Sequence, residues 1–65
     1  MLIKFNGTLE EVEAKSLADL VKEKNINCAR VVIEHNLNII DKDKLADVTL
    51  QDNDVIEVLS FIGGG

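Results

Sequence analysis

Residues 51–65 read QDNDVIEVLSFIGGG, an acidic turn followed by an apolar run that leads into three glycines. Within the turn, Asn53 is the residue most able to adopt a positive φ angle. The run that begins at Val55 is the longest β-type segment of the chain, and its apolar character predicts a central strand. We therefore expect the fold to be organised around this strand.

Size and composition limit what the chain can be. Its 65 residues suffice for one domain of marginal stability, because a chain this short hides only about 60% of the surface that it exposes when unfolded. The single cysteine, Cys28, cannot form an internal disulfide and is expected to be a partly buried structural residue. No residues stand at metal-ligand spacing, so we expect no metal and a core that depends on apolar packing.

The charge balance argues against nucleic acid as a partner. Acidic residues outnumber basic ones by 12 to 7, and the only aromatic residues are Phe5 and Phe61. An acidic surface suits a protein partner with a basic docking face, although net charge also serves solubility alone. The opening MLIKFNGTLE does not have the order of a secretory leader, and no apolar run approaches the roughly 20 residues that cross a bilayer. We expect a cytoplasmic protein that does not contact membranes.

The first half of the chain predicts a hairpin and a helix. Asn6-Gly7 is a strong two-residue turn signal between MLIKF, with Ile3 and Phe5 on one face, and TLEEVEA. A helix is predicted over 17–24. Ser16 stands at its N-cap with an acid three residues on, and its apolar residues follow the i, i+3, i+4 rule; Asn25 can end it in the left-handed conformation.

The second half predicts at least two further strands. The β-branched segment ARVVIEHN, from Ala29, predicts a strand that closes in a polar turn at 36–38. We then expect a single helical turn from Asp41 to Leu45. A short edge strand through Val48 and Leu50 is expected before the last strand. This order indicates an α+β domain with a sheet packed on one helix.

No catalytic site is evident within the predicted fold. If the third strand starts near Ala29, its extended run separates Cys28 from His35 by roughly 20 Å, too far for a nucleophile and its base. His35 is expected at the rim of the sheet. No glycine-rich phosphate loop precedes a helix. The paired carboxylates are expected to be solvated; they are Glu10 with Glu11 and Asp52 with Asp54.

Chemistry is instead expected at the glycines. Gly63, Gly64 and Gly65 have no side chains, so this segment can extend through a narrow channel and present a terminal carboxylate to another protein's active site. Such a carboxylate, with a reference pKa of about 3.5, is ionised at neutral pH and is a poor electrophile until it is activated. An ATP-dependent adenylating partner would activate it. We expect a folded domain over 1–62 and a flexible tail over 63–65.

The last strand also predicts a docking surface. If Ile56 and Val58 face the helix, Leu59 and Phe61 fall on the opposite face beside the tail, together with Ile62 at its entrance. Half-covered apolar side chains beside a reactive tail are typical of a surface that binds a partner. The alternative is a bulge that changes the phase and buries Phe61.

These features resemble a known family. A chain of this length with an early Asn-Gly turn, the segment LQDNDVIEV and the ending FIGGG resembles the ThiS family, the sulfur carrier proteins of thiamine biosynthesis, within the ThiS/MoaD β-grasp superfamily. The resemblance covers the whole chain and implies a β-grasp, or ubiquitin-like, mixed sheet packed on one main helix. Asn53 stands where the family commonly has glycine, and asparagine tolerates the same backbone conformation.

The resemblance implies a protein co-substrate rather than an enzyme. An E1-like enzyme would adenylate the carboxylate of Gly65 with ATP, and a relay protein that carries a cysteine persulfide would supply the sulfur of a thiocarboxylate. Thiazole synthase would receive this sulfur, and no cofactor would be stably bound. Gly64 and Gly65 correspond to the family's terminal glycines, Gly63 to a variable position, and Phe61 and Ile62 to the apolar residues that enter the tail.

Three alternatives stay open at this point. The small subunit of molybdopterin synthase has the same tail chemistry, but those chains tend to be longer and to end in two glycines. A ubiquitin-like modifier would end in an amide bond to a lysine. A non-covalent β-grasp interaction module would not use the glycines at all.

Overall fold

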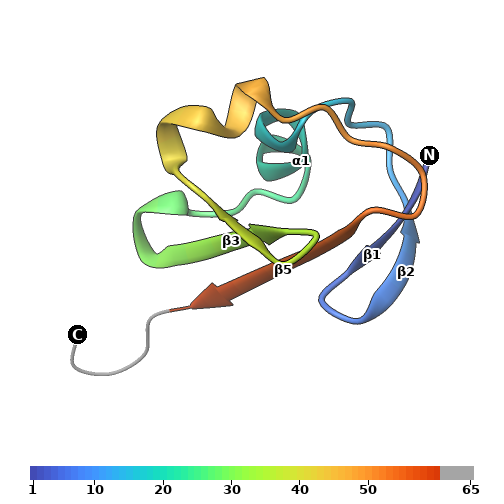
Figure 1. Cartoon of the computed structure of the whole chain (residues 1–65), viewed down its shortest axis with the longest axis horizontal. Helices are drawn as coiled ribbons and strands as arrows, with labels where there is room; N and C mark the ends of the chain where they lie inside the picture. The colour runs from blue at the N-terminus through green and yellow to red at the C-terminus, as the bar shows by residue number, and fades with distance from the viewer. Residues whose placement is uncertain (61–65) are drawn as a thin grey trace.

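The computed structural model describes residues 1–60, in which five strands form one mixed sheet and one α-helix covers one of its faces (Figure 1). The strand order is β2-β1-β5-β3-β4, which confirms the predicted sheet on a single helix. Phe61, Ile62 and the three glycines lie outside the described residues. The elements are β1 (Leu2–Phe5), β2 (Thr8–Glu11), α1 (Leu17–Glu23), β3 (Val31–His35), β4 (Asn38–Ile40) and β5 (Val55–Ser60), with 3₁₀ helices η1 (Cys28–Arg30) and η2 (Lys42–Asp47).

β5 is the central strand, as predicted. It pairs parallel with β1, where Lys4 lies opposite Val55, and antiparallel with the whole of β3 from Ile56 to Ser60. β1 and β2 form the predicted antiparallel hairpin, and both turn residues, Asn6 and Gly7, have positive φ angles of 48° and 85°. Such angles match the twist of a two-residue hairpin, which explains why asparagine and glycine occupy these positions.

α1 begins at Leu17 as the sequence predicts and ends at Glu23, one residue before the predicted end. The Ser16 hydroxyl oxygen accepts a hydrogen bond of 3.1 Å from the amide of Asp19, and the helix stops before Asn25, whose φ is 56°. Leu17 and Leu20 are both fully buried against the sheet. The helix therefore covers the apolar face of the sheet with one turn-spaced stripe of side chains.

The third strand begins later than predicted. Cys28–Arg30 form η1 instead of extended chain, because the side-chain oxygen of Asn27 caps this turn by accepting a hydrogen bond of 3.0 Å from the amide of Ala29. The following turn is also shorter than predicted. It consists of Asn36 and Leu37, with φ angles of 50° and 75°, so that Asn38 already belongs to β4.

The edge strand expected through Val48 and Leu50 is wrong. Leu50 is buried, and its amide donates to the carbonyl of Lys15 at 2.9 Å, while a single bridge joins Ser16 to Thr49. This segment therefore packs over the start of α1, and the edge of the sheet is β4. The turn expected to end at Leu45 is η2, which continues to Asp47.

The core lies between the sheet and α1, where Ile56 of β5 is completely buried. The other buried apolar residues are Ile3, Val12, Ala14, Leu17, Leu20, Ile33, Leu45 and Leu50.

We expect Ile56→Ala to lower the free energy of unfolding by about 2–5 kcal/mol, because the deleted side-chain atoms would leave a cavity in the core between the central strand and the helix. Ile39→Ala is the matched control, since Ile39 is 67% exposed, and it should change stability by no more than about 0.5 kcal/mol. Urea unfolding followed by circular dichroism measures both. Equal losses for the two variants would contradict the assignment of Ile56 to the core.

Candidate functional site

β5 leads directly into the segment on which the predicted chemistry depends. The predicted reactive residue Gly65, the tail residues Gly63 and Gly64, and the predicted docking residues Phe61 and Ile62 lie outside the described residues. Up to Ser60, the side chains of β5 alternate between the two faces of the sheet as expected. Ile56 and Val58 pack in the core, whereas Leu59 lies on the opposite face and is 48% exposed. The docking role of Leu59 stays a prediction.

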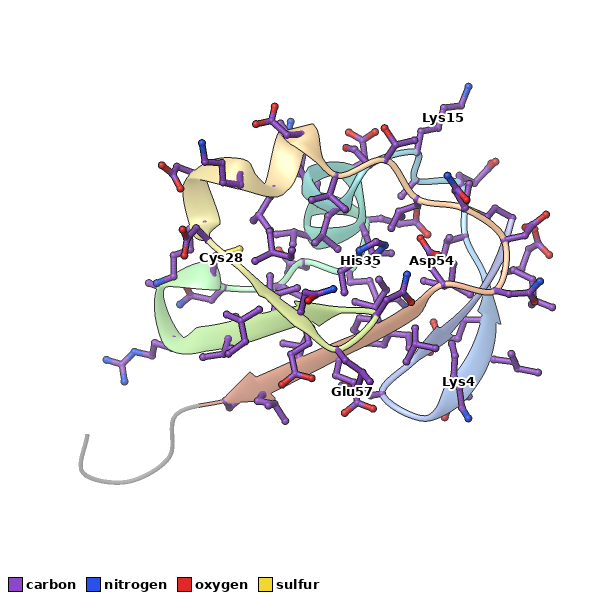
Figure 2. The ribbon with its side chains drawn as sticks, in the orientation of Figure 1. Lys4, Lys15, Cys28, His35, Asp54 and Glu57 are labelled. Carbon is purple, nitrogen blue, oxygen red and sulfur yellow. The ribbon has the colours of Figure 1, made fainter. Side chains whose placement is uncertain are left out.

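The turn before β5 contains a carboxylate that the sequence analysis placed wrongly. Asp54 is only 9% exposed, and its Oδ2 lies 2.8 Å from Nε2 of His35 (Figure 2). The same oxygen accepts a 2.9 Å bond from the amide of Gln51, and Oδ1 accepts a 3.2 Å bond from the Asn36 side chain. An ionised carboxylate can only accept hydrogen bonds, so Nε2 of His35 carries a hydrogen.

These hydrogen bonds determine the protonation of Asp54. Burial by itself raises the pKa of Asp54, but the bonds from His35, the Gln51 amide and Asn36 outweigh burial, and the pKa lies below the ordinary value of 3.8. Asp54 is therefore an anion at neutral pH. It joins the β3–β4 turn to the start of β5, and its role is structural.

The other three carboxylates of the two predicted pairs also differ in exposure. Glu11 and Asp52 are exposed, as expected. Glu10 is less solvated than expected: its side chain is 32% exposed, and its carboxylate forms an ion pair with Lys24 on the helix side of the sheet. The Lys24 ammonium also lies 4.6 Å from the centre of the Phe5 ring, in cation–π geometry.

The structure does not bring Cys28 and His35 together. Cys28 is half-buried in η1, before β3 begins, and His35 is the last residue of β3 and binds Asp54 (Figure 2). Among residues 1–60, no three side chains of histidine, cysteine, aspartate or glutamate are grouped as metal ligands would be. No helix in this part of the chain is long and apolar enough to cross a membrane.

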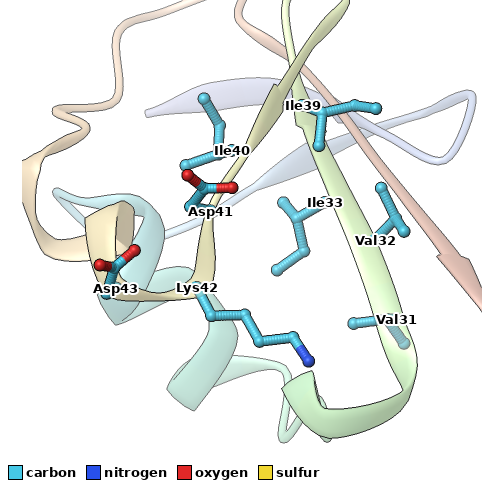
Figure 3. A pocket seen from close by; sticks show the side chains of 8 residues that line it. All are labelled: Val31, Val32, Ile33, Ile39, Ile40, Asp41, Lys42 and Asp43. Carbon is cyan, nitrogen blue, oxygen red and sulfur yellow. The ribbon is translucent and has the colours of Figure 1, made fainter.

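A shallow groove lies at the β4 edge of the sheet. It has a volume of about 520 Å³ and opens where the three-residue β4 ends and leaves the beginning of β3 without a neighbour on that side (Figure 3). Lys42 extends across it toward Val31. Its floor is aliphatic and its rim is charged; its lining is Val31, Val32, Ile33, Ile39, Ile40, Asp41, Lys42 and Asp43.

A comparison with protein-family models matches residues 3–65 to the ThiS family. The chain is 38% identical over 50 residues to the sulfur carrier protein ThiS of Bacillus subtilis (strain 168). This alignment covers 77% of this chain and 76% of that protein. It is also 33% identical over 66 residues to a thiazole synthase of Paramagnetospirillum magneticum (strain ATCC 700264 / AMB-1). That alignment includes the whole chain, which spans only 20% of the thiazole synthase.

Solved structures have the same architecture. The crystal structure of the thiamine biosynthesis protein ThiS from Geobacter metallireducens superimposes with a TM-score of 0.85 over the whole of both chains, at 28% identity. The solution structure of a thiamine biosynthesis protein from the same organism gives 0.77 over all of this chain and 88% of the other, at 29% identity. The fold is therefore that of a β-grasp protein. Within this class, the chain belongs to the ThiS family.

Sequence reasoning missed the network around Asp54. The signal in the sequence that could have indicated this network is the position of two residues. Asp54 stands directly before the most apolar strand, and His35 stands at the end of another strand, before the turn that begins with Asn36. Neither residue is unusual alone, and only the pairing of β3 with β5, which places His35 opposite Ile56, brings them within hydrogen-bond distance.

We expect Asp54→Asn to lower the free energy of unfolding at neutral pH by about 1–3 kcal/mol. Both carboxylate oxygens of Asp54 accept hydrogen bonds, and the side-chain NH2 of asparagine would replace one of these acceptors with a donor. In the wild type, the stability that Asp54 supplies is complete above its unfolded pKa and is lost as the pH falls through the lower folded pKa. Urea unfolding between about pH 5 and pH 2 should therefore show a shallower decline for Asp54→Asn. Asp47→Asn, at an exposed position, serves as the control. Parallel curves for wild type and Asp54→Asn would refute this role.

Proposed function

We propose that the chain is a sulfur carrier of thiamine biosynthesis whose working group is the carboxylate of Gly65. An E1-like enzyme transfers AMP from ATP to this carboxylate and releases pyrophosphate. Adenylation turns AMP into a leaving group, so that the terminal sulfur of a cysteine persulfide on the relay protein can displace it and form an acyl disulfide. A thiol then attacks the cysteine sulfur of this disulfide, which releases the thiocarboxylate and leaves a disulfide between the thiol and that cysteine. The thiocarboxylate then gives its sulfur to thiazole synthase. The chain itself is a co-substrate of these enzymes and not a catalyst.

The observation that carries this proposal is the family match, which extends through the three glycines to residue 65. The names of two relatives support the pathway, since one is a sulfur carrier protein and the other a thiazole synthase. The arrangement of the described residues is consistent with it. β5 pairs with β1 at its start and with β3 as far as Ser60, so the last described residue of the chain is held in the sheet.

Mass spectrometry of the intact chain tests the proposal. After incubation with the adenylating enzyme, ATP, the relay protein and a thiol reductant, we expect the mass to rise by the difference between one sulfur and one oxygen. Addition of thiazole synthase and its substrates should restore the original mass. A carrier of the molybdenum-cofactor pathway would keep the higher mass with thiazole synthase and would donate its sulfur only to the large subunit of molybdopterin synthase. Adducts with other proteins would indicate a modifier, and an unchanged mass would indicate a non-covalent module.

We expect Gly64→Val to reduce thiocarboxylate formation by about 100-fold or more, because a branched side chain next to the reacting carboxylate displaces it from its attack geometry. The urea midpoint should stay at the wild-type value. Ala46→Val, at an exposed position of η2, is the matched control for an added pair of methyl groups. Wild-type turnover by Gly64→Val would refute the proposal that the glycines enter a narrow channel.

A further inference from the structure

The two edge strands of the sheet, β2 and β4, differ in charge. The peptide groups along a sheet edge can pair with a strand of another chain, and charged side chains are a common means of preventing this. β2 carries Glu10 and Glu11. β4 reads NII and has no charged side chain, and its central residue, Ile39, is 67% exposed. The β4 edge therefore lacks the charges that protect the β2 edge.

The peptide groups of Ile39 point out of this edge. Successive residues of a strand direct their N–H and C=O to opposite sides. The Asn36 amide donates to the Val55 carbonyl at 2.8 Å, so Glu34, two residues earlier, also directs its peptide groups toward β5. Ile39 lies opposite Glu34 and cannot exchange bonds with it. Its N–H and C=O therefore face away from β3, and no strand formed by residues 1–60 lies on that side.

Leu37, in the turn before β4, is an exposed apolar side chain on a strained backbone. It is 86% exposed, and its φ of 75° lies in the left-handed region that favours glycine. The Asn36 side chain holds this turn, since it donates to Asp54 at 3.2 Å and accepts from the Val55 amide at 2.8 Å. The turn thus presents Leu37 in a fixed backbone conformation, and burial among residues 1–60 does not offset the strain.

The groove at the other end of β4 is complementary to an aliphatic side chain (Figure 3). It opens where β4 ends at Ile40, and Asp41 belongs to its lining. Its floor is aliphatic, and its volume of about 520 Å³ leaves room for a side chain such as leucine. Leu37 stands two residues before Ile39, and Asp41 two residues after it. An exposed leucine and a groove that can receive it are therefore placed symmetrically about Ile39.

We propose that two copies of the chain associate through β4, antiparallel, with Ile39 of one copy opposite Ile39 of the other. These two residues exchange both of their N–H···O=C bonds, as a hydrogen-bonded antiparallel pair does. The same register places Leu37 of each copy opposite Asp41 of the other, at the mouth of the groove. Every contact then occurs twice, as two-fold symmetry requires. Two five-stranded sheets become one continuous sheet with both α1 helices on the same side.

The spacing within β4 selects a second copy over an extended segment of another protein. Any extended segment could pair with Ile39, but a second copy also supplies Leu37 at the distance that reaches the groove. No like charges meet at the centre of the contact, because β4 is uncharged. A net charge of −5 on each copy still opposes association over longer distances, so added salt should strengthen it.

The dimer is expected to be transient. A three-residue strand and one side chain from each copy bury less than the roughly 1,200 Å² at which standard interfaces begin. We therefore expect a Kd between about 10 μM and about 1 mM. This association does not depend on the chemistry of the glycines, so it can be tested apart from the proposed function.

Sedimentation equilibrium of the purified chain measures this Kd, and two lysine variants test the surface. Ile39→Lys should raise Kd by about 10-fold or more, because each lysine would face its own copy across the two-fold axis. Leu9→Lys is the matched control, since Leu9 is 63% exposed on the β2 edge and the change in net charge is the same. It should change Kd by less than about twofold.

Leu37→Gly separates association from stability. It should raise Kd by about fivefold or more, because the groove loses the side chain that fills it. The Tm of the dilute monomer should at the same time rise by about 2–5 °C, because glycine adopts this φ without strain. A lower Tm would show that Leu37 stabilises the single chain, and would overturn its assignment to the contact.

Amide hydrogen exchange locates the contact within β4. The Ile39 amide should exchange several-fold more slowly at high protein concentration than at low concentration. The Ile40 amide is the internal control, because it faces β3 within each chain and its exchange should not depend on concentration. A chain that stays monomeric at about 1 mM would overturn the proposal. So would equal effects of Ile39→Lys and Leu9→Lys, or exchange at Ile39 that does not change with concentration.

Discussion

Hydrogen bonding along both edges of β5 holds the two halves of the sheet together. The β1–β2 hairpin and the β3–β4 hairpin are not neighbours in the sheet, where β5 lies between them. An isolated two-stranded hairpin has marginal stability in water, and neither half could cover α1 alone. The N-terminal and C-terminal parts of the chain therefore become one domain only when the last strand inserts between them.

The turn before β5 determines the register of this insertion. The Asp54 carboxylate accepts hydrogen bonds from His35 at the end of β3 and from Asn36 in the turn that follows. The backbone carbonyl of Asp54 accepts a bond of 2.9 Å from the Lys4 amide of β1. The backbone amide of Val55 donates to the side-chain oxygen of Asn36. A shift of β5 by one residue would break these bonds and turn Ile56 toward solvent. The carboxylate thus helps to fix which side chains of β5 face the core and which face away from it.

Local chemistry made much of the fold predictable. Asn6-Gly7, the Ser16 cap and the positive φ of Asn53 are each determined by a few neighbouring residues, and each is found as predicted. The alternation of Ile56, Val58 and Leu59 is equally local. Burial on the core side of the sheet follows from the same period of two.

The errors arise where distant segments decide the outcome. β4 has three residues and follows a turn that contains Leu37, where glycine would be the usual signal, so nothing local marks it. Val48 and Leu50 have a strand-like spacing, but the hydrogen bond from the Leu50 amide to the Lys15 carbonyl holds this segment against the start of α1. Asp54 looks solvated beside other polar residues until the fold places His35 against it.

The mixed pairing of β5 also has a mechanical consequence. β5 runs parallel to β1 and antiparallel to β3, and its last residue, Ser60, still lies opposite Val31. A pull along the strand from its Ser60 end stresses the bonds to both neighbours together, in shear, and does not open them one after another. A protein that grips the chain beyond Ser60 can therefore draw it into a tight passage without unravelling the domain that delivers it.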